Sequence, residues 1–217
     1  MSQFEQERRM MVDGQIRIAD VTNRRLQQAL LSVPRELFMP RAKRAQAYAD
    51  VEVEFAPGRW MMRPRDFAKL VHAADVQPSD LVLDLACGRG YSSAILGRMA
   101  ETVVAMESEA RLVEKSETAL SKTGSDNVAV IQGDLKTGSQ SQGPFNVIFV
   151  NGAVEDVPRA WLDQLADGGR LAVVVRRGPI GKATLYHRSG LGIGERVIFD
   201  CTPHILPGFE REAGFVF

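Results

Sequence analysis

The sequence predicts an α/β fold with a mostly parallel central sheet and an antiparallel edge at its C-terminal end. Short apolar runs alternate with helical patterns, one of these runs leads into a glycine-rich turn, and acidic residues follow the ends of neighbouring runs. Alternating strands and helices form parallel sheets, because each helix carries the chain back across the sheet. The expected strands are residues 81–85, 101–108, 127–134, 145–151 and 170–175.

The glycine-rich turn follows the first expected strand, residues 81–85, which is apolar on both faces, as in a buried parallel strand. Ala86, Gly88 and Gly90 leave little side chain between the backbone and a ligand. From Tyr91 onward the pattern predicts a helix whose first turn points free N–H groups toward the same crevice. This arrangement is typical of a nucleotide-like cofactor site at the end of a parallel strand.

Asp84 favours a cationic cofactor over a dinucleotide. A carboxylate just before the turn gains nothing from a pyrophosphate, and Ser93 stands where a third glycine would be expected. S-adenosylmethionine carries a sulfonium and an ammonium group, which an acid attracts directly or through water. We therefore expect this methyl donor rather than NAD. The alternative is an ordinary strand, turn and helix with an incidental acid.

Polar residues also follow the next three strands. Glu107 lies about 20 residues past the turn at the tip of the adjacent strand, where a carboxylate can accept hydrogen bonds from both ribose hydroxyls. In methyltransferases of this architecture the third tip contacts adenine and the fourth lines the methyl-transfer face, so Asp134 and Asn151 are expected ligand-side residues. Both also fit as turn formers, Asp134 by capping a loop and Asn151 by adopting left-handed geometry.

We expect a single domain of 217 residues with three parts. Residues 1–80 form a helical lid and a substrate-side segment, in which Thr22 caps a helix over 24–31; residues 81–175 form the cofactor-binding core, and residues 176–217 the antiparallel strands. Within these parts, further helices are expected over 110–120 and 158–165, with a helix-ending turn at 167–169. The last two strands are expected over 197–217 around a turn at Pro207 and Gly208, with a buried apolar end at 215–217.

Composition narrows the functional classes. The 27 basic and 27 acidic residues balance and are not clustered, so no nucleic-acid partner is expected. Neither the two cysteines nor the three histidines have a metal-binding spacing, so no metal is expected. No apolar run approaches a membrane span and the N-terminus is no secretory signal, so we expect no membrane association and a cytoplasmic location.

A resemblance to a known family extends over most of residues 11–185. The order of residues near the N-terminus resembles the start of protein-L-isoaspartate O-methyltransferases: Met11, Val12, Gln15, Ile16, Asp20, Val33, Pro34, Arg35, Glu36, Phe38, Pro40, Ala47, Tyr48 and Asp50. In the core, Gly88 to Tyr91 match the family's glycine-rich turn, Glu107 its acid, and Gly133, Asp134 and Leu135 match its Gly-Asp-Gly in part.

The resemblance implies a Rossmann-like class I methyltransferase. It would move the methyl group of S-adenosylmethionine to the side-chain-derived carboxylate of an isoaspartyl residue in a protein or peptide, leaving S-adenosylhomocysteine. The methyl ester then loses methanol to form a succinimide, which can hydrolyse back to aspartate. On this basis the expected function is protein repair, and Tyr91, Gly133 and Leu135 join the expected donor-side residues.

The sequence departs from the family at residues 58–64, where the family usually reads Gly-Gln-Thr-Ile-Ser-x-Pro. Arg59 and Trp60 replace the glutamine and threonine, and Met62 replaces the serine that lies beside the reacting carboxylate. Because methionine cannot hydrogen-bond a carboxylate, the catalytic group is unknown and a changed or weakened acceptor specificity is favoured.

Three interpretations of this segment remain open. Trp60, Met61 and Met62 can form a contact surface for a different protein or small-molecule acceptor. Arg59 or Arg63 can clamp the isoaspartyl carboxylate bidentately. The apolar side chains can also be ordinary core packing. A catalytically silent module that binds the cofactor or a partner is a further alternative.

Overall fold

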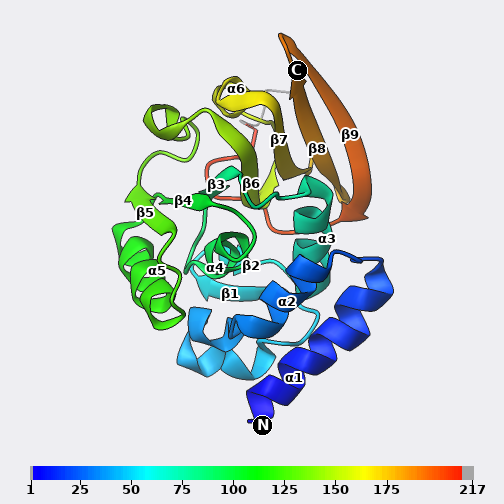
Figure 1. The fold of residues 1–217 in the computed structure, drawn as a ribbon, viewed down its shortest axis with the longest axis vertical. Coiled ribbons are helices and arrows are strands. Elements are labelled where there is room, and N and C mark those ends of the chain that lie inside the picture. The colour runs from blue at the N-terminus through cyan, green and yellow to red at the C-terminus, as the bar shows by residue number, and fades with distance from the viewer. Residues whose placement is uncertain (1, 212–217) are drawn as a thin grey trace, which may run out of the picture.

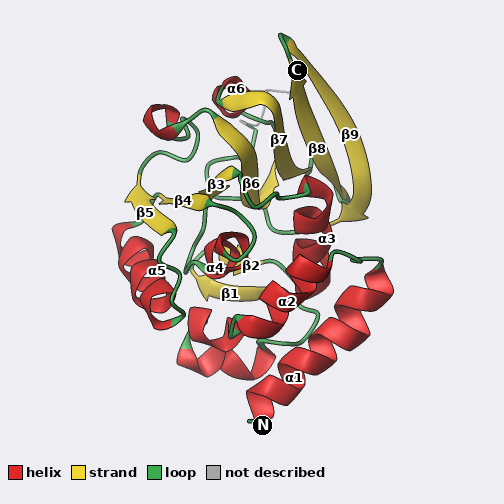
Figure 2. Cartoon of the chain, viewed as in Figure 1, coloured by secondary structure: helices red, strands yellow, loops and turns green. Residues whose placement is uncertain are grey.

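The computed structural model describes residues 2–211, and its centre is a seven-stranded sheet (Figures 1 and 2). In sheet order the strands are β5 (Val128–Gln132), β4 (Thr102–Glu107), β3 (Leu81–Leu85), β6 (Phe145–Val154), β7 (Leu165–Val175), β8 (Gly181–Ser189) and β9 (Gly192–Cys201). Strands β3 to β7 pair in parallel, whereas β8 and β9 are antiparallel. The predicted fold class, with its antiparallel C-terminal edge, is confirmed.

The order of the parallel strands reverses beside β3. The chain proceeds from β3 to β4 and β5 on one side, and β6 and β7 then extend the sheet from the other side of β3. Helices α4 (Tyr91–Gly97), α5 (Ala110–Lys122) and α6 (Arg159–Asp163) connect these strands. Ligands of such sheets bind outside the carboxyl ends of the strands near the reversal, which is where the glycine-rich turn lies.

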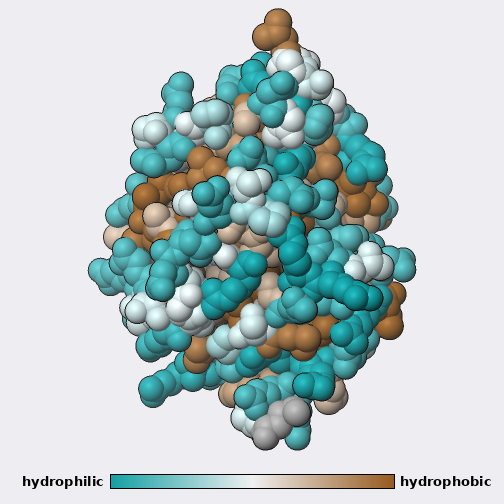
Figure 3. All heavy atoms as spheres, in the orientation of Figure 1, coloured by the Kyte–Doolittle hydropathy of each residue, from teal (hydrophilic) through white to brown (hydrophobic). Residues whose placement is uncertain are grey.

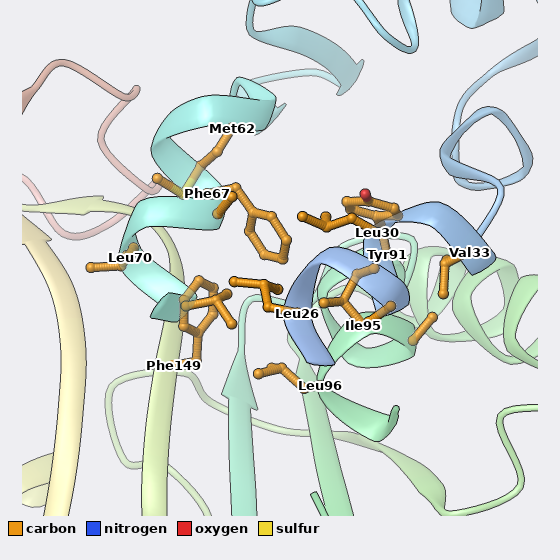
Figure 4. Close-up of a cluster of buried hydrophobic side chains, with 14 of the residues drawn as sticks. Leu26, Leu30, Val33, Met62, Phe67, Leu70, Tyr91, Ile95, Leu96 and Phe149 are labelled. Atoms are coloured by element: carbon orange, nitrogen blue, oxygen red, sulfur yellow. The ribbon is translucent and has the colours of Figure 1, made fainter. Parts of the chain in front are cut away.

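Apolar side chains cover both faces of the sheet, because successive residues of a strand point to opposite sides. One buried cluster includes Leu83, Ile148 and Trp161, and the other includes Phe67 and Phe149. Helix α3 (Pro64–Ala74) packs on the second face, and Figure 4 shows its Phe67 among side chains from α2, α4 and β6. The face of the molecule shown in Figure 3 is mostly hydrophilic with small hydrophobic areas. No helix within residues 2–211 is long and apolar enough to span a bilayer.

The N-terminal region is helical and lies against the sheet domain through α3 and α4. It comprises α1 (Gln3–Met11), η1 (Val12–Ile16), η2 (Arg17–Ala19), α2 (Arg24–Ser32), η3 (Arg35–Phe38) and η4 (Arg41–Gln46). Helix α2 is capped by Asn23, whose side-chain oxygen accepts the N–H of Leu26 at 3.1 Å, so the expected cap at Thr22 was wrong by one residue. Leu26 and Leu30 of α2 are fully buried beside Tyr91 of α4 (Figure 4).

Two local predictions were wrong near α6. The helix ends at Asp163 rather than at residue 165, and residues 167–169 belong to β7 instead of ending the helix. Gln164 caps the end of the helix instead, and its backbone N–H donates to the Trp161 carbonyl. Its side-chain amide donates to the carbonyls of Thr137 and Ala160 and accepts the N–H of Ser139. The left-handed φ of +74° at Gly168 is therefore a turn within the β7 segment.

The C-terminal hairpin differs from the prediction as well. Its turn lies at Gly190 and Leu191 between β8 and β9, where Gly190 takes a φ of +56°. After Cys201 the chain leaves the sheet and crosses to β6, with a single bridge between Ala153 and Ile205. The expected turn at residues 207–208 thus lies in a crossing loop. The expected apolar strand at residues 215–217 lies outside the described residues.

Residues 53–61 form a separate antiparallel hairpin between the N-terminal helices and the parallel sheet (Figure 1). Strands β1 (Val53–Ala56) and β2 (Arg59–Met61) are joined by Pro57 and Gly58, and the φ of +69° at Gly58 fits the third position of a type II turn. The register shifts between Glu54 and Ala56, which leaves Phe55 as the extra residue of a bulge. Bulges re-aim side chains, and this one directs Phe55 toward the glycine-rich turn.

Candidate cofactor and acceptor site

The glycine-rich turn has left-handed backbone at three positions, with φ of +56° at Ala86, +60° at Gly88 and +89° at Gly90. Such a conformation is easy for glycine but costs a residue with a Cβ atom about 1–3 kcal/mol. The turn is fastened to β4 by the N–H of Cys87, which donates to the Met106 carbonyl at 3.2 Å. Strain at Ala86 in a fastened turn is typical of a ligand site.

Asp84 is fully buried at the end of β3 and organises the side chains around it. One carboxylate oxygen accepts the hydroxyls of Ser92 and Ser93 at 2.7 and 2.6 Å, and the other accepts the amide of Asn151 at 2.6 Å. Burial raises the pKa of Asp84 to about 6, although these hydrogen bonds oppose the shift. Asp84 itself does not line the cavity described below, whereas Ser92 and Asn151 do.

Glu107 lies beside the turn at the tip of β4, fully buried and fully hydrogen-bonded. The N–H of Gly88 donates to Oε2 at 2.8 Å and the N–H of Ser108 donates to Oε1 at 2.7 Å. Arg59 donates to both oxygens at 2.6 Å in a bidentate ion pair. Burial acts to raise the pKa of Glu107, but the hydrogen bonds and charge of Arg59 outweigh burial and lower it.

The tips of the third and fourth strands are also close to the turn. Gly133 lies against the Met106 side chain, whose methyl would lie 2.3 Å from a Cβ at this position. Asp134 is exposed and its side chain accepts the N–H of Lys136 at 2.9 Å, which is the turn-forming geometry. Leu135 is buried in the core, and Asn151 is not left-handed but donates to the Leu85 carbonyl at 3.0 Å.

The hairpin places the divergent residues in two environments. Arg59 is only 3% exposed and lies on the donor side against Glu107. Trp60 stacks on His204 with the ring centres 3.9 Å apart and the planes nearly parallel. Met61 and Met62 are buried, and Figure 4 shows Met62 beside Phe67 in the apolar cluster. Met62 is thus part of the apolar core, and it also lines the cavity described below.

Both arginines of the expected carboxylate clamp have acidic partners in this arrangement. Arg59 is engaged by Glu107, and Arg63 lies 3.5 Å from the Asp66 carboxylate in an ion pair of α3. Arg35, which had no expected role of its own, takes their place in the site. It is 1% exposed, and Nη2 donates to the Met62 carbonyl at 2.6 Å. Its Nε and Nη1 have no hydrogen-bond partner among residues 2–211, while the guanidinium lies 4.7 Å from the centre of the Tyr91 ring.

A small cavity lies where the hairpin meets the glycine-rich turn. Its volume is about 20 Å³, enough for about one water molecule. Its lining brings together Arg35, Phe55, Trp60, Met61, Met62, Phe67, Ala86, Cys87, Arg89, Tyr91, Ser92 and Asn151. The two arginines are its charged lining residues, and no carboxylate within residues 2–211 lines it. Three expected donor-side residues (Ala86, Tyr91 and Asn151) and three expected substrate-side residues (Trp60, Met61 and Met62) thus meet at one cavity. The other expected site residues do not line it: Arg59, Arg63, Asp84, Gly88, Gly90, Glu107, Gly133, Asp134 and Leu135.

The topology of the sheet, the strained turn at its reversal point and the acid at the neighbouring strand tip define a class I S-adenosylmethionine-dependent methyltransferase. Comparison with known proteins gives the particular family. The profile of the protein-L-isoaspartate(D-aspartate) O-methyltransferase family matches residues 6–194, and the chain belongs to this family. The enzyme class is thus an O-methyltransferase that uses S-adenosylmethionine.

Curated relatives and solved structures agree with this assignment. Protein-L-isoaspartate O-methyltransferases of Koribacter versatilis and Methanoregula boonei are each 36% identical, over 79% and 78% of this chain and 78% of each relative. A Plasmodium falciparum protein solved with S-adenosyl-L-homocysteine, described as a putative member, has a TM-score of 0.78 at 18% identity, covering 95% of this chain and 99% of its own. Another solved protein-L-isoaspartate O-methyltransferase has a TM-score of 0.77 at 23% identity, covering 94% of this chain and 65% of that longer chain. At these identities the two structures support the fold.

The donor-side residues are of the types that bind S-adenosylmethionine, but in this structure they are not arranged to bind it. The turn and Glu107 are those that the fold uses for S-adenosylmethionine. However, Arg59 occupies both oxygens of Glu107, and the cavity of about 20 Å³ is far smaller than the roughly 300 Å³ of a small ligand site. In this arrangement Arg59 closes Glu107 to a ribose.

Proposed function

We propose that this chain methylates the side-chain-derived carboxylate of isoaspartyl residues in proteins, and that it serves in protein repair. The support is the family match together with the charge of the cavity beside the glycine-rich turn. Arg35 and Arg89 line that cavity and no acid does, so the electrostatics favour an anionic acceptor. A cytoplasmic location is proposed with it, because Cys87 and Cys201 are both unpaired thiols.

Arg35 is the residue that we assign to the acceptor carboxylate. A buried guanidinium with two unpartnered nitrogen atoms carries a large desolvation cost, which a carboxylate at those atoms would offset. Arg35 also touches the backbone of Met62, the position at which the family has its serine. The guanidinium of Arg35 would thus take the place of the serine hydroxyl that is absent at position 62.

The chemistry asks little more of the protein. S-adenosylmethionine, when bound, supplies an activated methyl group. A carboxylate is already a nucleophile at neutral pH, so the chain's own residues need to orient it and to exclude water. Arg35 would orient the carboxylate, and the apolar surfaces of Met62 and Phe67 would keep water from it.

Methylation of paired peptides tests this function. With labelled S-adenosylmethionine, we expect the isoaspartyl form of a peptide to be methylated and its aspartyl form to remain unlabelled. Arg35→Met should raise the KM for the isoaspartyl peptide about tenfold or more, as for the loss of a charge-assisted hydrogen bond, whereas Arg41→Met on the exposed η4 surface should leave it unchanged. Equal labelling of both peptides, or none of either, would contradict the function.

A second candidate is favoured by one observation. The ion pair between Arg59 and Glu107 closes the donor side, and a chain in which it never opens would be a catalytically silent partner-binding module. The absence of turnover with every acceptor, together with no donor binding by calorimetry, would favour that candidate.

A further inference from the structure

We infer that Arg59 is an internal competitor of the methyl donor: the β1–β2 hairpin holds its guanidinium on Glu107, where the donor's ribose hydroxyls would bind. The donor enters only when the hairpin withdraws. This inference rests on the proposed function, since it takes S-adenosylmethionine as the ligand of the turn.

The hydrogen bonds of Glu107 leave no acceptor position for a ribose. Oε1 accepts from Nη1 of Arg59 and from the N–H of Ser108, with longer contacts from the Ser108 hydroxyl at 3.2 Å and the Glu109 N–H at 3.4 Å, and Oε2 accepts from Nη2 of Arg59 and from the N–H of Gly88. A carboxylate offers about four such positions, two on each oxygen. The backbone donors belong to the strand tip and the turn themselves. Among these donors Arg59 alone comes from the hairpin, and its departure would remove one donor from each oxygen, where the two hydroxyls could take its place.

Phe55 reinforces the closure from the same hairpin. If Gly88 carried a Cβ atom, that atom would lie 2.5 Å from the Phe55 ring, so the ring rests directly on the backbone of the turn. The guanidinium of Arg59 lies 5.9 Å from the centre of the same ring. The bulge at Phe55 brings both side chains to the donor side, so a single movement of the hairpin would clear both.

The hairpin is built as a separable unit. It forms its own two-stranded sheet and is not paired with any strand of the seven-stranded sheet. Isolated two-stranded hairpins are marginally stable, so side-chain contacts at its ends decide whether it stays closed. Those contacts include the Arg59–Glu107 ion pair on the donor side and the stack of Trp60 on His204 on the other, while Val53 and Met61 bury their side chains in the apolar core.

A contribution to stability does not explain why the Arg59–Glu107 ion pair is present. Buried ion pairs contribute little net stability against apolar residues of similar size, because both charges lose their hydration. Glu107 is held ionised and desolvated, which is the state that a ribose-binding carboxylate requires. The arrangement is therefore better explained by an ion pair that opens so that the donor replaces Arg59 on Glu107 than by a purely structural pair.

Calorimetric titration of S-adenosylhomocysteine into the full chain tests the inference. Arg59→Gln should bind it about tenfold or more tightly than the wild type, because the competing charge and one arm of the bidentate pair are gone. Arg59→Lys keeps the charge but loses the fork, and should fall between the two. Arg65→Gln is the matched control: it removes an arginine near the hairpin that pairs with Asp50 and Asp66, and it should leave the affinity unchanged.

Each outcome decides between the inference and the function on which it rests. If Arg59→Gln weakens the binding of S-adenosylhomocysteine or leaves it unchanged, the competitor role is overturned and the proposed function stays intact. No binding by the wild type or by any variant would overturn both. If Arg59→Gln does not fold, Phe55→Ala serves in its place and should also tighten binding. Hydrogen exchange at residues 53–61 gives an independent readout, and it should accelerate when S-adenosylhomocysteine is added to the wild type.

Discussion

Two buried carboxylates at neighbouring strand tips have opposite environments. Asp84 is surrounded by neutral hydroxyl and amide donors, and burial raises its pKa to about 6. Glu107 faces the guanidinium of Arg59, and its pKa is lowered despite its burial. Charge compensation rather than depth determines the difference, because both side chains are fully buried. The two residues therefore contribute to stability in opposite pH ranges.

Asp84→Asn should change how stability depends on pH. Because the pKa of Asp84 is higher in the folded than in the unfolded state, its contribution is complete below about pH 4 and is lost as the pH rises through about 6. The loss amounts to about 3 kcal/mol for a shift of about two units. Between pH 4 and 7 the free energy of unfolding, measured with urea, should show this loss in the wild type but not in the variant. Parallel pH profiles for the two proteins would contradict the assignment.

The donor side was more predictable from sequence than the acceptor side. Asp84, Gly88 and Glu107 were found because strand tips and glycine-rich turns follow local rules, and the structure places them together. Their ligand roles remain proposals. Arg35 was missed because its signal, an arginine within an apolar segment, does not show which cavity it faces. The pairing of Arg59 with Glu107 joins residues far apart in the chain, and no local pattern predicts such a contact.

Among the elements, the β1–β2 hairpin depends on one backbone conformation. Gly58 takes a φ of +69° after Pro57, in a turn that sets which side chains β1 and β2 present to the site. A type II turn requires left-handed backbone at this position, which glycine adopts without strain. The local stability of the hairpin, and with it the placement of Arg59, should therefore depend on Gly58.

Gly58→Ala should loosen the hairpin without altering the sheet. The strain of a left-handed alanine costs about 1 kcal/mol, so amide hydrogen exchange at residues 53–61 should accelerate roughly fivefold. Gly194→Ala is the control: Gly194 lies in β9 without a left-handed φ, and no atom lies within 4 Å of the added carbon. Equal exchange in the hairpins of both variants would show that the turn does not control this element.

Elements with strong periodicity were predicted better than connections. Strands β3, β4, β5 and β6 were expected close to their observed positions, because buried parallel strands are nearly continuous apolar runs. The C-terminal hairpin was displaced, since Pro207 and Gly208 carry the stronger turn signal but belong to a loop that crosses to β6. Turn propensity marks a change of direction and not which strands pair across it.

At the scale of the whole molecule, the seven-stranded sheet and the hairpin divide the work. The sheet, with apolar clusters on both faces, fixes the turn and the strand tips that would hold the donor. Arg59 and Trp60 of the hairpin depart from the family's sequence, and the hairpin closes over the donor side. Donor binding should consequently be linked to the opening of the hairpin. A ligand that binds the folded chain also stabilises it against unfolding, by an amount that grows with the logarithm of its affinity.

Thermal unfolding of the wild type and of Arg59→Gln, with and without S-adenosylhomocysteine, tests most directly whether Arg59 closes a donor site that is otherwise complete. Without ligand, the variant should unfold at a lower temperature, because Glu107 loses its charged partner. At one ligand concentration well above both dissociation constants, tenfold tighter binding adds about 1.4 kcal/mol, so the variant's Tm should rise about 4 °C more than that of the wild type. An equal or smaller rise in the variant would contradict the account.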